Sequence, residues 1–259
     1  METSVQPNKE ALVEALFTAG AQFGFSRSRR HPSTSAYIYG VKNRVEIIDL
    51  EKSADALARA CEFVTNVAKK REKMLFVANK LEAKALVREA AERLQLPYVK
   101  ERWLGGTMTN WTEMKKRIAR LEDMSTKREN NELGMYTKKE RLLIDREIAH
   151  LERFFGGLVS MGQLPSALFV VDPREEKTAM HEARALHIPV VALAGTDCDI
   201  SQVAYPIVVN DSSRTSIAYV VGQIAAAYEE GLKLAPEGAA GIVTPAGTET
   251  LATVSPATE

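Results

Sequence analysis

Two runs of five purely apolar residues constrain the fold of this chain more than any other feature. One is MLFVA at Met74–Ala78, and the other is ALFVV at Ala167–Val171. A short run without polar alternation is typical of a strand that is buried on both faces of a parallel sheet. Such strands need a layer of helices on each side, so the two runs predict an α/β layered fold.

Helical and strand patterns alternate along most of the chain and extend this prediction. Apolar residues at helical spacing predict helices at residues 9–19, 53–70 with Ser53 as N-cap, 80–94, 175–186, and from 211–213 to 228. Short apolar segments predict strands at residues 45–50 (with 37–39 as a pairing partner), 97–99, 189–194 and 205–209. The composition of residues 22–40 is that of a loop. This alternation favours a mainly parallel sheet.

One segment interrupts the alternation and predicts a helical insertion. Apolar residues recur from Met108 to Met124, and again from Ile144 to Phe155, at intervals of three and four residues. These intervals are close to the coiled-coil repeat of about 3.5 residues. The polar stretch Lys127–Gly134 can turn the chain between the two runs, so we expect an antiparallel coiled-coil hairpin. Its outer faces mix basic and acidic residues, which suits either a solvated surface or a docking surface.

Composition narrows the cellular setting. The chain has 259 residues, a formal net charge of zero and two cysteines. A nucleic-acid interface would therefore have to be a local basic patch. Two isolated thiols without CxxC spacing indicate a reducing compartment. No apolar run is long enough to span a bilayer, and the N-terminus shows no apolar signal segment, so we expect a soluble cytoplasmic protein without a membrane partner.

A local basic patch is present near the N-terminus. No acidic residue occurs between Ala15 and Val45, whereas this segment contains Arg27, Arg29, Arg30, Lys42 and Arg44. Aromatic residues, among them Tyr37 and Tyr39, are interspersed with these cations. Arginine suits phosphate because its planar guanidinium offers two directed donors, and tyrosine can stack on a base.

The segment Tyr98–Asn110, YVKERWLGGTMTN, marks the start of the insertion. Arg102 and Trp103 precede two glycines, and Thr107 or Thr109 can cap the long charged helix that follows. A cation and an indole beside a helix N-terminus could hold phosphate or stack on a base. Alternatively, the tryptophan plugs the junction between the insertion and the body.

The usual motifs of nucleotide-binding and hydrolytic α/β enzymes are missing from the sequence. It contains no GxGxxG after the first strand, no GxxxxGK[ST] and no GxSxG. The best polar cluster is GTDCD at Gly195–Asp199, after a predicted strand. Its Asp197, Cys198 and Asp199 could ligate a metal with His181 or His187, or they could form a capped turn around a buried thiol.

Asp172 also follows a predicted strand, and it is either site material or a helix start with Pro173 in the first turn. The carboxyl ends of strands are where α/β folds bind ligands. The edge formed by Asp172, Asp197 and Asp199 therefore keeps open an alternative function, that of a flavodoxin-like enzyme or nucleotide-binding protein.

Several segments together resemble one family. They are IIDLEK at 47–52, LFVANK at 75–80, YVKERWLGGTMTN at 98–110, ALFVVDPREEKTAMHEARALHIPVVAL at 167–193 and TDCD at 196–199. In order and spacing they are similar to the bacterial form of protein two of the small ribosomal subunit. The resemblance covers residues 10 to 232, and the combination of the 98–110 and 171–174 blocks around a heptad-bearing insertion is highly specific.

The resemblance implies a flavodoxin-like three-layer αβα domain with a projecting coiled-coil hairpin and no enzymatic activity. It implies a peripheral position on the small subunit, contacts with ribosomal RNA and neighbouring small-subunit proteins, and a role in late assembly and translation. Relatives in many bacteria also help to dock the large ribosomal protein that captures messenger RNA. The corresponding division of this chain is a body at 9–105 and 158–232, a hairpin at 106–157, and a disordered tail at 233–259.

Two departures from the family pattern affect metal binding. The family usually has H-F-G-H near its first helix, where this chain has Gln22–Phe25, and N-D-D before its last helix, where this chain has Asn210–Ser212. Most of the possible ligands are therefore lost. We predict no bound zinc, no other cofactor and no catalytic residue, and the loss weakens the expectation that the messenger-capturing protein docks here.

The sequence thus yields a set of predicted RNA-contacting residues in the basic patch, the start of the insertion and the hairpin. They are Arg27, Arg29, Arg30, Tyr37, Lys42, Arg44, Arg102, Trp103, Lys115, Lys116, Arg120, Lys138 and Lys139.

Overall fold

A five-stranded parallel sheet forms the centre of the molecule and confirms the predicted α/β fold class. The structure is a computed structural model that describes residues 9–130 and 132–235. The strands are β4 (Met74–Val77), β5 (Tyr98–Val99), β6 (Ala167–Val171), β7 (Val190–Ala194) and β8 (Tyr205–Val208), in the order β5-β4-β6-β7-β8. All neighbouring pairs are parallel.

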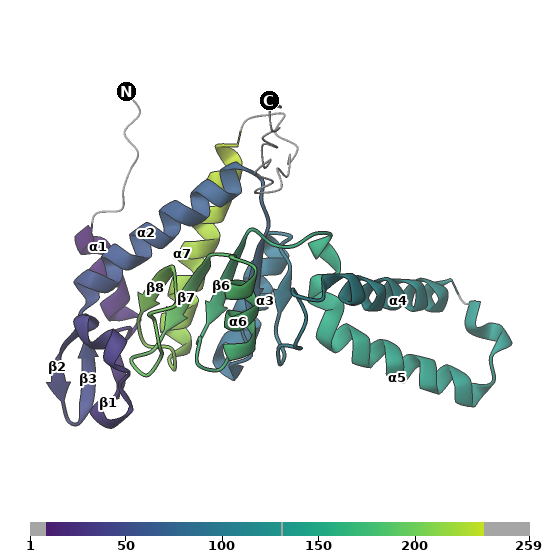
Figure 1. Ribbon diagram of the computed structural model, residues 1–259, viewed down its shortest axis with the longest axis horizontal. Coiled ribbons are helices and arrows are strands. Elements are labelled where there is room, and N and C mark those ends of the chain that lie inside the picture. Colours follow the sequence, from purple (N-terminus) through teal and green to yellow (C-terminus); the bar gives the residue numbers. More distant parts are fainter. Residues whose placement is uncertain (1–8, 131, 236–259) are drawn as a thin grey trace, which may run out of the picture.

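Helices cover both faces of this sheet, as the apolar strands require (Figure 1). On one face lie α1 (Lys9–Thr18), α2 (Leu50–Lys69), α3 (Leu81–Arg93) and α7 (Arg214–Lys233). On the other face lie α6 (Lys177–Ala185) and the base of the insertion. Along β4, Met74 and Phe76 pack into the first core, and Leu75 and Val77 pack into the second. This is why the strand has no polar alternation.

A second, smaller sheet was not predicted. β1 (Phe23–Ser26), β3 (Val45–Ile48) and β2 (Ile38–Lys42) form an antiparallel sheet in the order β1-β3-β2. The prediction that residues 37–39 pair with 45–50 is partly confirmed, because β2 pairs with β3. Residues 22–40, predicted as a loop, instead contain β1, the short helices η1 (Arg27–Arg29) and η2 (Pro32–Tyr37), and the start of β2. The serines and glycines of this segment are typical of loops, so its composition did not indicate these short elements.

Three predicted helix starts were wrong. α2 begins after Asp49, whose carboxylate accepts from the N–H groups of Glu51 and Lys52, whereas the Ser53 hydroxyl donates to the Val208 carbonyl. α4 begins after Asn110 and not after Thr107 or Thr109, and α6 begins after Glu176, four residues beyond Asp172. Before α2 and α4 more than one residue of capping type is present, and the local pattern alone does not decide which of them begins the helix.

The insertion forms a projecting pair of helices (Figure 1). It consists of α4 (Trp111–Glu129), η3 (Glu132–Met135), α5 (Lys138–Phe155) and η4 (Gly156–Met161). Ile118 and Leu121 of α4 are buried in the same cluster as Ile148 and Leu151 of α5. We call α4 through α5 the hairpin. Whether the two helices supercoil remains a prediction.

The remaining organisational predictions are not tested by the fold. Division into a body, a hairpin and a tail remains a prediction, and residues 236–259 of the predicted tail lie outside the described residues. Among the helices of the described residues, none combines the length and apolar character needed to cross a bilayer.

Candidate functional site

The carboxyl edge of the parallel sheet is where the enzyme alternative would place a ligand. The strand order reverses direction between β4 and β6, because β5 lies on one side of β4 and β6 on the other. In α/β folds, ligands enter the crevice at such a reversal, outside the carboxyl ends of the strands. Here β4 leads to Asn79 and Lys80, and β6 leads to Asp172.

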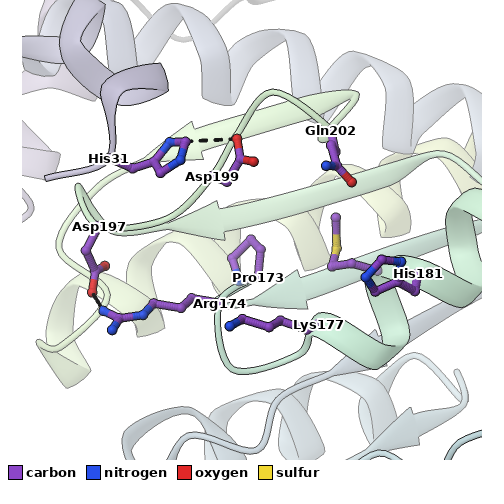
Figure 2. A pocket seen from close by; sticks show the side chains of 9 residues that line it. His31, Pro173, Arg174, Lys177, His181, Asp197, Asp199 and Gln202 are labelled. Carbon is purple, nitrogen blue, oxygen red and sulfur yellow. Dashed lines mark hydrogen bonds and ion pairs between the residues drawn. The ribbon is translucent and has the colours of Figure 1, made fainter. Parts of the chain in front are cut away.

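A shallow outer pocket of about 320 Å³ lies over this edge, between the loops after β6 and β7 (Figure 2). Within it, the Arg174 guanidinium donates to the Asp197 carboxylate, and His31 Nδ1 lies 3.8 Å from Asp199 Oδ1. Asp199 also accepts from the hydroxyl and the N–H of Ser201. The two acids of the GTDCD segment are therefore already bonded to, or lie beside, neighbouring side chains of the protein itself.

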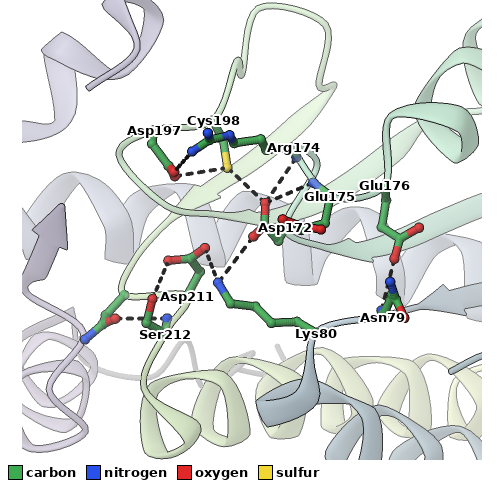
Figure 3. Close-up of polar contacts among 11 residues, drawn as sticks. Asn79, Lys80, Asp172, Arg174, Glu175, Glu176, Asp197, Cys198, Asp211 and Ser212 are labelled. Carbon is green, nitrogen blue, oxygen red and sulfur yellow. Dashed lines mark hydrogen bonds and ion pairs between the residues drawn. The ribbon is translucent and has the colours of Figure 1, made fainter. Parts of the chain in front are cut away.

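Beneath this pocket, a lysine lines the crevice at the strand reversal and pairs with two carboxylates (Figure 3). Lys80 Nζ lies 2.8 Å from Asp211 Oδ2 and 3.2 Å from Asp172 Oδ2. Burial alone would lower the pKa of Lys80, but the hydrogen bond and charge of Asp211 outweigh it and raise that pKa. The lysine therefore stays charged and balances two carboxylates in a region closed to most solvent.

The same cluster contains the one trio of metal-ligand type among the described residues. Atoms of Asp172, Cys198 and Asp211 lie within 4.8 Å of one another. The Lys80 ammonium group already contacts both carboxylates, and Cys198 Sγ donates to Asp172 Oδ1 at 3.4 Å. Burial raises the pKa of the Cys198 thiol, which disfavours the thiolate that a metal needs. These residues do not fit a divalent cation while Lys80 is in place, and the absence of zinc remains a prediction.

A third carboxylate, that of Glu176, lies beside the crevice at the N-terminus of α6. Glu176 Oε1 accepts the Asn79 N–H at 3.0 Å, and this side chain joins the loop after β4 to the N-terminus of α6 (Figure 3). Burial raises the pKa of Glu176 to about 7. Both acidic and basic side chains line the crevice, and several of them pair with one another.

The predicted RNA-contacting residues lie elsewhere, in two groups. The first group is on the small sheet, and we call residues 27–44 the basic arm. Arg27, Arg29, Lys42 and Arg44 are exposed, and none of them pairs with a carboxylate within residues 9–130 and 132–235. Asn43 and Arg44 both have positive φ and form a two-residue turn between β2 and β3, which displays the cations beside it.

Two predicted members of the basic arm point inward instead. Arg30 Nη1 lies 3.3 Å from Oε1 of Glu46, a side chain with no exposed surface. Tyr37 is half-buried against the cluster of Ile48 and Cys198, whereas Tyr39 is 82% exposed. Arg30 therefore serves the protein's own buried carboxylate, and Tyr39 is better placed than Tyr37 to stack on a base.

The second group lies on the hairpin and at its base. Arg102, Lys115, Lys116, Arg120, Lys138 and Lys139 are all exposed. Some of them have acidic neighbours: Lys116 pairs with Glu113, and Arg120 pairs with Glu147 on the other helix. Lys138 and Lys139 make no ion pair with another described residue. The small sheet and the hairpin lie at opposite ends of the molecule (Figure 1), so the two groups are not brought together.

Trp103 is buried, with 5% of its surface exposed, and its Nε1 donates to Glu182 Oε1 at 2.9 Å. An indole in this position cannot stack on a base without leaving the core, so we omit Trp103 from the RNA-contacting set. Glu182 itself was missed in the sequence. Its only signal is a carboxylate on the apolar side of α6, between Ala179 and Ala183 in the core.

Comparisons with known proteins agree on one family. Residues 16–231 match the family described as Ribosomal protein S2. A "Small ribosomal subunit protein uS2" from Spiroplasma citri is 43% identical over 86% of this chain, but the match spans only 62% of that relative. Proteins with the same description from Mesoplasma florum and Chloroflexus aurantiacus are 41% and 38% identical, over 88% and 85% of this chain and 86% and 93% of their own lengths.

Proposed function

The chain belongs to the family of ribosomal protein S2, and we propose that it holds its place in the small ribosomal subunit by gripping folded ribosomal RNA with two separate basic surfaces. These surfaces are the basic arm and the hairpin. The protein acts in the cytoplasm as part of the ribosome, at the periphery of the subunit and beside other small-subunit proteins, and it supports late assembly and translation.

The observation that carries this proposal is the exposure of unpaired cations on the basic arm. Arg27, Arg29, Lys42 and Arg44 face solvent without a described acidic partner. Contacts from such cations to phosphates release counterions and supply affinity without reading sequence. Because the whole chain has no net charge, attraction to RNA must come from these local groups, and a peripheral position fits that balance.

We also propose that the protein performs no chemistry. The enzyme or nucleotide-binding alternative finds no support in the matched family or in the relatives named above, which carry a ribosomal description. Two of the acids that the enzyme alternative required form ion pairs within the protein. Asp172 shares Lys80 with Asp211, and Asp197 pairs with Arg174. Three of the acids at this edge are therefore already engaged by basic groups of the protein itself.

Charge reversal on the basic arm tests the RNA-binding role. The variant Arg27→Glu/Arg29→Glu should cosediment poorly with small subunits, and the slope of log affinity against log salt should become shallower by about two, because two phosphate contacts are lost. Arg30 is kept, since Arg30→Glu would place a second carboxylate beside buried Glu46 and disturb the fold.

The matched control is Arg59→Glu/Lys70→Glu, which reverses two exposed cations of the α2 region and should leave both quantities unchanged. Normal association of the Arg27→Glu/Arg29→Glu variant, with an unaltered salt slope, would count against the basic arm as an RNA surface.

A further inference from the structure

The loop that enters the hairpin is organised around one buried carboxylate. Glu182, on α6, is 7% exposed. Its Oε1 accepts from Trp103 Nε1 at 2.9 Å and from the Gly106 N–H at 2.7 Å. Its Oε2 accepts from the Met108 N–H at 2.8 Å, and from the N–H and hydroxyl of Thr109 at 3.0 and 3.2 Å.

These bonds join the loop to a part of the body that lies far away in the sequence. The donors belong to residues 103–109, immediately before α4 begins, and the acceptor belongs to a helix about 75 residues further along the chain. Burial would raise the pKa of Glu182, but the hydrogen bonds from Trp103, Thr109, Met108 and Gly106 outweigh it and lower that pKa. The side chain is therefore an ionised, acceptor-only group that matches a set of donors.

Other contacts hold the hairpin's base near Glu101 and at its exit. Glu101 Oε2 lies 3.0 Å from Lys84 Nζ and 3.4 Å from Arg153 Nη2 on α5, in a partly exposed position. At the end of α5, Gly157 packs on Tyr98, where an added Cβ would lie 2.2 Å from the Tyr98 carbonyl oxygen. The exit of the hairpin is thus held by close packing, and its entry is held by hydrogen bonds to Glu182.

We propose that Glu182 is a positioning residue that fixes the direction in which the hairpin projects from the body. It does so by locking residues 103–109 against α6, so that α4 leaves the body at a single angle. The consequence for RNA binding rests on the proposed function: a fixed angle between the two basic surfaces lowers the entropic cost of binding both to one folded RNA.

Glu182→Gln is the sharpest test, because it hardly changes the volume but replaces an acceptor oxygen with an NH2 group. That group can only donate, and it must face at least two of the donors that now bind the carboxylate. We expect the loop to detach and the hairpin to sample a range of directions.

Pulsed electron paramagnetic resonance between two spin labels can measure this in the full chain. Labels at Arg128→Cys, near the end of α4, and Glu62→Cys, on α2, report the distance from hairpin to body, and both positions are exposed. The native thiols should react slowly at neutral pH, because burial raises the pKa of Cys61 to about 12 and also raises that of Cys198.

The distance distribution should be narrow in the parent and in the control Glu175→Gln, whose exposed side chain makes no hydrogen bond within the described residues. It should broaden or shift in Glu182→Gln. An unchanged distribution in folded Glu182→Gln overturns the proposal. If that variant does not fold, Trp103→Phe decides, since it removes one donor to Oε1 and leaves the carboxylate in place. Broadening then supports the proposal, and an unchanged distribution rejects it.

A separate measurement distinguishes a failure of the proposed RNA-binding function from a failure of the role proposed for Glu182. Lys138→Glu/Lys139→Glu reverses two hairpin cations in the first turn of α5, where acidic residues suit the helix dipole and the fold should be preserved. We expect unchanged spin-label distances and weak incorporation into small subunits. Normal incorporation of this variant would reject RNA binding by the hairpin, while the distances in Glu182→Gln would still decide the role of Glu182.

Discussion

Buried carboxyl groups at two places in this protein differ in protonation because they differ in hydrogen-bond donors. Glu182 accepts from five donors, and its pKa is lowered despite burial. Glu176 accepts one backbone N–H, and burial raises its pKa to about 7. Asp211, which shares Lys80 with Asp172, has its pKa raised to about 6, chiefly by burial. Burial raises the pKa of a carboxyl group unless enough hydrogen-bond donors reverse the shift.

The raised pKa of Glu176 predicts a pH-dependent stability. Its pKa in the folded state, about 7, lies above the ordinary value of 4.5. The stability that this group contributes is therefore fully present below about pH 4.5 and is lost as pH rises through about 7. Glu176→Gln stays neutral, and its amide oxygen can still accept the Asn79 N–H. At pH 8 we expect the variant to be more stable than the parent by on the order of 2 kcal/mol.

Urea unfolding between about pH 4 and pH 8 measures this difference. The free energies of unfolding should coincide at the acidic end and diverge as pH rises, while the exposed control Glu175→Gln should follow the parent throughout. Parallel curves for Glu176→Gln and the parent would show that Glu176 ionises normally in the folded protein.

At the residue scale, sequence identified most of the acids at the carboxyl edge but not their partners. Asp172, Asp197 and Asp199 were singled out because they follow predicted strands. Lys80 lies 92 residues before Asp172 and 131 before Asp211, and nothing in the local pattern marks it as their counter-ion. The function of such a cluster depends on contacts across the fold, so carboxylates that suggest a metal or catalytic site turned out to be internally balanced.

At the element scale, prediction succeeded where hydrophobic burial dominates. The apolar runs at β4 and β6 come from side chains packed into cores on both faces of the sheet, and the helical stripes of α2 and α7 come from side chains packed into one of these cores. β1 was missed because FGFS is short and contains glycine and serine. Gly24 is nevertheless required there, because an added Cβ would lie 2.5 Å from Cγ2 of Thr196. Close approach between β1 and the loop after β7 is a tertiary contact that a local sequence pattern does not reveal.

Two glycines in α7 provide an element-scale prediction with an internal control. A Cβ on Gly231 would lie 2.4 Å from the Thr65 carbonyl oxygen of α2, whereas a Cβ on Gly222 would meet nothing within 4 Å. Gly231→Ala should destabilise the protein by about 1–3 kcal/mol, because α2 and α7 must separate. Gly222→Ala should stabilise it by up to about 1 kcal/mol through helix propensity.

Chemical unfolding of the two variants checks this pair. Both substitutions add the same methyl group to the same helix. Opposite signs of the change in the free energy of unfolding would therefore reflect the difference in packing between the two positions. A stabilising Gly231→Ala would mean that α2 and α7 do not approach as closely as the structure describes.

At the scale of the whole molecule, a body with internally paired charges separates two exposed basic surfaces. The fold class and the projecting helices followed from sequence, because strand burial and helical spacing are local signals. The separation of the arm from the hairpin did not, since it depends on how the sheet and the insertion are placed (Figure 1). If both surfaces bind RNA as proposed, the protein should leave two RNA footprints rather than one.

The most direct test of this account is ultraviolet crosslinking of the protein within assembled small subunits, followed by identification of the RNA-linked peptides. The account predicts links from residues 27–44 and from the hairpin helices, and none from the carboxyl edge around Lys80, Asp172 and Asp211. Links confined to that edge, or to the face formed by α2 and α7, would contradict it.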